Sequence, residues 1–260
     1  MCPILWAISA VTLFARAAAQ EPSPPAKPFA IERVSWSKDA DGPPIRTVEV
    51  HNDYGDIRAR FTPDRRIEAW GVVQRLGRGP EGVGLTVERR GDVVALTVAY
   101  PPGRIQDSET APAKDSLDRL DLTVFVPEGV ALGARTLRGM VEARGLKSDV
   151  TAATLDGNIS VSTRGVLQAR SERGAVTATI EPSPGSRPLL IETTSGAIEL
   201  TLSERADLEW TATTSAKVTS AFSLRHHGAR ARATGTIGHP QRELTVVSQS
   251  GAITLRRRSP

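Results

Sequence analysis

The sequence predicts an all-β protein in which most of the chain forms a β-solenoid, a parallel β-helix-like stack of coils of about 18–20 residues each. Three observations favour this class. Short runs rich in Val, Ile, Thr and Leu alternate with polar residues and end at Gly, Asn, Asp or Pro, which is typical of strands. A glycine followed two residues later by Ile or Val recurs at nearly constant spacing in the second half. Aromatic residues make up only 4% of the chain, which suits a narrow core between stacked strands.

The first element is a predicted signal peptide at residues 1–19. An apolar run at residues 4–15 is followed by Ala17-Ala18-Ala19, the small-residue pattern after which signal peptidase cleaves. The run is shorter than the about 20 residues that span a bilayer, so export to the periplasm or cell surface is favoured over a membrane anchor. Cys2 is the only cysteine, and its removal with this segment would leave no thiol for a disulfide or a metal site.

Two segments of the chain are expected to lack regular structure. Residues 20–30 contain four prolines, which favour an extended tether. Residues 101–117 mix Pro, Gly, Ser, Lys and Asp, which predicts a long polar loop.

Residues 31–127 are predicted to form an antiparallel β region at the N-terminal end of the stack. Two strands, at residues 47–51 and 56–61, flank a turn-forming Asn-Asp-Tyr-Gly segment. Two more, at residues 84–88 and 92–98, flank an Arg-Arg-Gly turn. Hairpins are therefore expected here.

Residues 128–260 carry the glycine repeat and are expected to continue the same stack. The repeat glycines are followed two residues later by an apolar residue, and their positions, with Ala216 replacing one glycine and Gly235 as a weaker member, are Gly139, Gly157, Gly174, Gly196, Ala216, Gly235 and Gly251. Successive spacings are 18, 17, 22, 20, 19 and 16 residues. Because glycine tolerates positive φ, each is expected at a sharp corner between two strands.

The strand after each corner predicts which side chains fill the core. Alternation places the following residues inward: Ile159, Val161, Val176, Ala178, Ile198, Leu200, Ile253 and Leu255. The dipeptides Asp156-Gly157, Ser195-Gly196 and Ser250-Gly251 also suit tight hairpin turns. An antiparallel β-sandwich or meander is therefore the alternative fold.

The order of these motifs resembles a known family. Residues 48–57 read Val-Glu-Val-His-Asn-Asp-Tyr-Gly-Asp-Ile, a strand ending in Val126-Pro127 follows, and Ser/Thr-x-x-Gly-x-Ile repeats continue to the end. This pattern resembles the bacterial putative adhesin family of domain of unknown function 4097 over residues 45–258. Departures are Ala216 and the absence of Ser or Thr directly before Gly139. The resemblance implies an exported, solenoid-like cell-envelope protein and offers no catalytic residues.

The sequence shows no recognisable catalytic or metal-binding constellation. The four histidines, His51, His226, His227 and His239, match no metal signature, and no glycine motif suits a phosphate loop. Acidic residues of the repeats occupy no shared position, as Glu172, Glu181, Glu192 and Glu199 illustrate. We therefore predict no catalytic residue, no metal site and no cofactor. Some parallel β-helices are polysaccharide lyases or hydrolases, so such an enzyme is the first alternative function.

Positive charge is concentrated near the C-terminus. From residue 203 onward nine Arg or Lys face four Asp or Glu. A patch that could bind an anionic polymer is predicted at Arg225, His226, His227, Arg230, Arg232, Arg256, Arg257 and Arg258. The competing interpretation is a solvated rim that prevents end-to-end stacking.

These observations favour a non-enzymatic, exported binding scaffold of the cell envelope. The expected partner is an envelope polysaccharide or a protein, and a module that acts only through a protein partner is the second alternative. A nucleic-acid partner is disfavoured, because basic and aromatic residues do not interleave.

Overall fold

The computed structural model describes residues 30–38, 44–75, 83–100, 118–183, 185–227 and 231–258. The predicted signal peptide and the predicted loop at residues 101–117 lie outside these ranges, and Ala30, the last residue of the predicted tether, begins the first strand. Strands are the only regular elements of the described residues. These residues therefore contain no helix that could span a bilayer.

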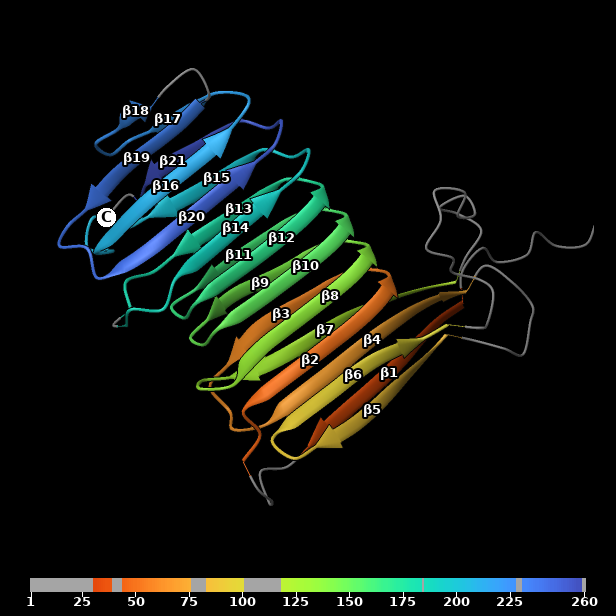
Figure 1. Cartoon of the computed structure of the whole chain (residues 1–260). Coiled ribbons are helices and arrows are strands. Elements are labelled where there is room, and N and C mark those ends of the chain that lie inside the picture. The colour runs from red at the N-terminus through yellow and green to blue at the C-terminus, as the bar shows by residue number, and fades with distance from the viewer. Residues whose placement is uncertain are drawn as a thin grey trace, which may run out of the picture.

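The described strands form two sheets that lie face to face in one elongated stack (Figure 1). Sheet I contains, in spatial order, β1 (Ala30–Lys38), β4 (Ile67–Arg75), β7 (Arg119–Pro127), β3 (Ile57–Thr62), β9 (Val141–Leu146), β11 (Ile159–Thr163), β13 (Val176–Ile180), β15 (Ile198–Leu202), β21 (Ile253–Arg257) and β17 (Val218–Ser220). Sheet II contains β18 (Arg225–His227), β19 (Ala231–Ile237), β16 (Leu208–Thr214), β20 (Arg242–Ser248), β14 (Leu189–Thr193), β12 (Leu167–Arg173), β10 (Val150–Asp156), β8 (Ala131–Arg138), β2 (Thr47–Tyr54), β6 (Val93–Ala99) and β5 (Gly84–Arg90).

Each coil consists of a strand of sheet II, a corner, and a strand of sheet I. Neighbouring coils pair in parallel and in register, so that Ile159 lies beside Val176 and Val176 beside Ile198. This pairing confirms the predicted solenoid and excludes the antiparallel sandwich for the repeats. All eight core positions predicted from the alternation are buried.

The chain order differs from the stacking order at the C-terminal end. The coil β20–β21, last in the chain, lies between β14–β15 and β16–β17. Ile253 therefore pairs with both Ile198 and Val218. The segment Gly235-Thr236-Ile237 is not a coil corner, because β19 runs antiparallel to β16.

The N-terminal region is only partly antiparallel. The pairs β1–β4, β4–β7 and β5–β6 are antiparallel, and the β5–β6 hairpin turns at Gly91 with a φ of 65°. The expected hairpin around Asn52 is instead a coil, because β2 belongs to sheet II and β3 to sheet I. This coil lies between β6–β7 and β8–β9.

The corner glycines are required for close backbone approach. A Cβ built on the glycine of one coil would lie 1.8–2.0 Å from the carbonyl oxygen of the glycine on the neighbouring coil, at Gly139, Gly157, Gly174, Gly196 and Gly251. None of these five has a positive φ, so the conformational reason expected from the sequence is wrong for them. No larger residue fits, since the backbones of adjacent corners are in contact.

A column of buried polar side chains follows the same corners. Each hydroxyl lies three residues before a corner glycine, or two before Ala216, and donates to the glycine carbonyl of the neighbouring coil at 2.7–3.2 Å. The donors are Thr136, Thr154, Ser171, Thr193, Thr214 and Ser248, all buried. Asn52 occupies the equivalent position on β2 and donates to the carbonyl of Leu120 at 2.7 Å. Carbonyls that would otherwise be buried without a donor are thus satisfied.

Candidate functional site

A groove of about 590 Å³ runs along the corner where the strands of sheet II end. Its lining residues are Tyr54, Asp56, Arg119, Arg138, Gly139, Met140, Asp156, Gly157, Asn158 and Arg173. Four of these, Tyr54, Arg138, Asp156 and Arg173, are the last residues of β2, β8, β10 and β12 and lie in register. Strand pairing therefore fixes the spacing of the charges along the groove.

The arginines of this corner lie on alternate strands. Arg138 ends β8 and Arg173 ends β12, with Asp156 of β10 between them. Two strand spacings separate their Cα atoms by about 10 Å. Three residues earlier, on the outer face of sheet II, Arg135 and Arg170 repeat the arrangement on the same two strands.

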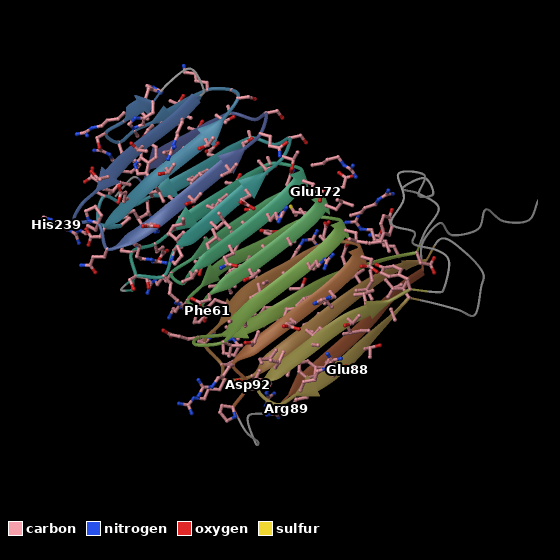
Figure 2. All side chains as sticks on the ribbon, viewed as in Figure 1. Phe61, Glu88, Arg89, Asp92, Glu172 and His239 are labelled. Atoms are coloured by element: carbon pink, nitrogen blue, oxygen red, sulfur yellow. The ribbon has the colours of Figure 1, made fainter. Side chains whose placement is uncertain are left out.

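These four arginines have no partner within the described part of the chain. No carboxylate oxygen of a described residue lies within 4 Å of Arg135, Arg138, Arg170 or Arg173. Glu172, next to Arg173, lies at the edge where the arrows of sheet II end (Figure 2). The guanidinium groups are therefore available to a ligand.

The opposite wall of the groove is a fixed ion-pair network. Arg119 contacts Asp56 at 2.8 Å and Asp121 at 2.7 Å, and Asp56 also contacts Arg58 at 3.0 Å. Burial alone would lower the pKa of Arg119, but the hydrogen bond to Asp121 and the charges of Asp121 and Asp56 raise it above its ordinary value. Asp56 also accepts the Met140 N–H at 2.9 Å, which fixes the corner. The two arginines and two aspartates of this wall therefore balance in charge.

A buried tyrosine lies next to the groove. Tyr100 lies beside it, and its hydroxyl donates to Asn52 Oδ1 at 2.7 Å and contacts the Tyr54 carbonyl oxygen. Burial raises the pKa of Tyr100, and hydrogen bonds to the backbone of Leu120 and Tyr54 only partly offset that effect. The described residues contain no group of three His, Cys, Asp or Glu side chains placed to hold a metal ion. The groove therefore offers a ligand the guanidinium groups of Arg138 and Arg173 with the carboxylate of Asp156 between them.

The C-terminal arginines of the predicted patch are each paired with a glutamate. Arg256 contacts Glu199 at 2.8 Å, Arg257 contacts Glu204 at 2.5 Å, and Arg258 contacts Glu181 at 3.1 Å. The Arg257 guanidinium also lies 5.7 Å from the centre of the Phe222 ring. These contacts neutralise much of the charge that the sequence concentrates here.

The remaining patch residues lie at the C-terminal end of sheet II. Arg225, His226 and His227 form the exposed strand β18, and Arg232 lies on β19 opposite His227. His227 Nε2 is 2.8 Å from the Thr234 hydroxyl. Arg230 lies outside the described residues. The patch is thus divided between sheet II and residues 256–258 at the end of β21 in sheet I, and its anion-binding role stays a prediction.

The arginines on β8 and β12 had a signal in the sequence. Residues 135–139 read Arg-Thr-Leu-Arg-Gly and residues 170–174 read Arg-Ser-Glu-Arg-Gly, so both arginines recur at the same position of two repeats. The intervening repeat has Ala153 and Asp156 at these positions. Net charge conceals this pattern, whereas alignment of the repeats reveals it.

Comparison with known proteins identifies the fold. The sequence matches no protein family and no curated protein. The structure is similar to that of a putative cell adhesion protein from Clostridium sporogenes, with a TM-score of 0.57 and 10% identity, covering 88% of this chain and 100% of that one. A putative adhesin from Bacteroides fragilis gives a TM-score of 0.41 and 12% identity, covering 87% and 97% of the two chains. At this identity the first likeness shows the fold alone: the chain shares the β-rich architecture of the Clostridium sporogenes structure.

Proposed function

We propose that this protein is a non-enzymatic, adhesin-like binding scaffold of the cell envelope that holds an acidic polysaccharide across strands β8 and β12. The observation that carries the proposal is the set of four unpaired arginines in register on these two strands. Arginine suits this role because its planar guanidinium group forms bidentate contacts with carboxylates.

The strand between the arginines supports a ligand with spaced charges. Asp156 lies between Arg138 and Arg173, and Ala153 lies between Arg135 and Arg170. Asp156 would repel a polymer that carries an anionic group on every sugar. A polymer with acidic and neutral sugars in alternation would place its carboxylates on the arginines and a neutral unit beside Asp156.

Export and the adhesin-like role have independent support. The apolar start of the chain and its alanine cleavage pattern favour export. The similar structure from Clostridium sporogenes is described as a putative cell adhesion protein. The motif order resembles the adhesin family of domain of unknown function 4097. An extended, rigid stack of coils also presents a broad binding surface.

Binding to immobilised polysaccharides tests the proposal. Hyaluronate, in which uronic acid and neutral sugar alternate, should retain the protein more strongly than polygalacturonate, and neutral dextran should not retain it. The double variant Arg138→Gln/Arg173→Gln should bind hyaluronate about tenfold more weakly, the equivalent of two modest surface contacts. Because the contacts are exposed, added salt should also weaken binding.

The matched control is Arg256→Gln/Arg257→Gln, which removes two arginines that already have glutamate partners. It should leave hyaluronate binding unchanged. Equal losses in both double variants, or no retention of the original protein, would refute the arginine site. Release of unsaturated or reducing sugar ends during incubation would show that the protein is an enzyme and would contradict the scaffold proposal.

A further inference from the structure

A second cationic site lies at the opposite edge of sheet II, where its strands begin. Arg242 is the first residue of β20 and alternates with Leu244, Val246 and Ser248, all of which face the core. Only 6% of Arg242 is exposed. Arginine is rarely this buried without a counter-ion, so its presence at an inward position breaks the pattern of the strand.

Arg242 has a hydrogen bond but no carboxylate partner. Its Nε donates to the Arg187 carbonyl oxygen at 3.2 Å, and within the described residues no carboxylate oxygen lies within 4 Å of its guanidinium group. The two nearby carboxylates have other partners. Asp149 pairs with Arg187 at 2.7 Å and accepts the Val166 N–H, and Asp207 accepts the His239 N–H at 2.8 Å.

Burial is the largest cause that lowers the pKa of Arg242, and the positive charge of Arg187 lowers it further. Asp149 offsets only part of this effect. The folded protein therefore holds a cation whose charge is incompletely balanced, an arrangement that costs stability unless an anion joins it.

Arg242 lines a pocket of about 300 Å³. Pro182, Ser183 and Gly185 line it ahead of β14, Arg205 and Asp207 line it ahead of β16, and Gln241 lies next to Arg242. This volume is at the lower end of the range of small-molecule sites. His239, close to this pocket in sequence, lies at the edge opposite Glu172 (Figure 2). The pocket and the corner groove share no lining residue, so they are distinct sites.

We propose that this pocket binds the carboxylate or phosphate group of a small, monosaccharide-sized ligand. Arg242 is the buried cation that receives the oxyanion through its planar fork, and Arg205 at the exposed rim adds a second positive charge. Gln241 offers an amide to the uncharged part of the ligand. The site does not depend on the polysaccharide surface of β8 and β12.

Thermal unfolding of the full chain tests the site with two probes. Inorganic phosphate and glucuronate are each added to the protein, against sodium chloride at matched ionic strength. We expect at least one of them to raise Tm saturably, because a ligand that binds only the folded state stabilises it. A response to glucuronate alone identifies a carboxylate site, and a response to phosphate alone identifies a phosphate site.

The variant Arg242→Met distinguishes a ligand site from a structural arginine. It should abolish the response to both anions and raise Tm in anion-free buffer, because it replaces an unbalanced buried charge with an apolar chain of similar length. Arg242→Lys keeps the charge without the fork and should weaken anion affinity at least about tenfold by calorimetry. Arg225→Gln, on the remote strand β18, should respond like the original protein.

Two results would overturn the proposal. One is a Tm response of the original protein to phosphate and glucuronate no larger than that to sodium chloride. The other is an unchanged anion response in Arg242→Met or Arg242→Lys. Neither result depends on polysaccharide binding, so the two proposals fail separately.

Discussion

At the scale of single residues, each corner of the stack depends on two small side chains. A glycine allows the backbone of the adjacent corner to approach, and a hydroxyl three residues earlier donates to the glycine carbonyl on the neighbouring coil. Thr193 also accepts the N–H of Gly196 at 3.2 Å, and Ser248 accepts that of Gly251 at 2.8 Å. These two hydroxyls thus join their own corner to the neighbouring one.

Gly174→Ala should be strongly destabilising. The added Cβ would lie 1.9 Å from the Gly157 carbonyl oxygen, and backbone on both sides prevents relief. We expect a loss of about 3 kcal/mol in the free energy of unfolding, measured by urea denaturation. The control is Gly133→Ala on β8, whose nearest contact would be an ordinary 3.6 Å. Equal stabilities of the two variants would contradict the close-approach explanation.

Tyr100 should make stability fall at alkaline pH. Its folded-state pKa is raised above 10.0, so the folded protein keeps a proton that the unfolded chain loses. The contribution of Tyr100 to stability is therefore fully present below pH 10 and declines as pH rises above it. Tyr100→Phe should be less stable at neutral pH, because Asn52 loses a donor, but should decline less steeply above pH 10. Parallel alkaline slopes in urea titrations would refute this assignment.

The sequence could identify the corner residues but not their physical reason. Glycine at a regular interval suggests positive φ, yet of the glycines in this column only Gly55 has one, with a φ of 145°. Close approach depends on a residue one coil away, which no local pattern reveals. Gly139 is an example. It lacks Ser or Thr directly before it and therefore departs from the repeat in sequence, but Thr136, three residues earlier, supplies the hydroxyl.

At the scale of elements, one corner differs and marks the end of the stack. Thr193 and Ile198 are separated by five positions, as are Ser248 and Ile253, whereas Thr214 and Val218 are separated by four. This corner has Ala216 in place of glycine. The coil β16–β17 therefore lacks the glycine carbonyl against which a further coil would stack, and β17 is the edge strand of sheet I in the described chain.

The position of β20–β21 leads to a prediction about deletions. Removing residues 205–238 would connect β15 directly to β20 through five residues, at an edge where β11 and β12 are joined by three. This variant should fold cooperatively, because β20–β21 keeps its pairing with β14–β15. Removing residues 239–260 instead takes away the coil between two others, so β16–β17 should lose protection.

Limited proteolysis with mass spectrometry distinguishes the two deletions. Cleavage of the C-terminal truncation should concentrate at residues 204–238, while the internal deletion should resist protease up to its thermal transition, followed by circular dichroism. Undiminished protection of residues 204–238 in the truncated chain would show that β16–β17 does not need the inserted coil.

At the scale of the whole molecule, the fold was largely predictable and the site was not. Alternation and a period near twenty residues favour the parallel stack, and the in-register pairing of Ile159, Val176 and Ile198 excludes the antiparallel alternative. The sequence does not predict the order of the coils at either end, because several coils have similar apolar edges and each could pair with more than one neighbour. The charged C-terminal run, Arg256 to Arg258, is conspicuous in sequence but is paired with glutamates from distant segments. Binding surfaces emerge only when register is known.

The insertion of β20–β21 also affects the time at which the protein can complete its structure. Synthesis delivers β16 and β17 before the strands on which they rest, and β17 has no described neighbour other than β21. Their apolar sides stay uncovered until residues 242–257 have left the ribosome. A chain that stops before β21 would therefore expose strands that proteases recognise, so survival of the product depends on translation through β20 and β21.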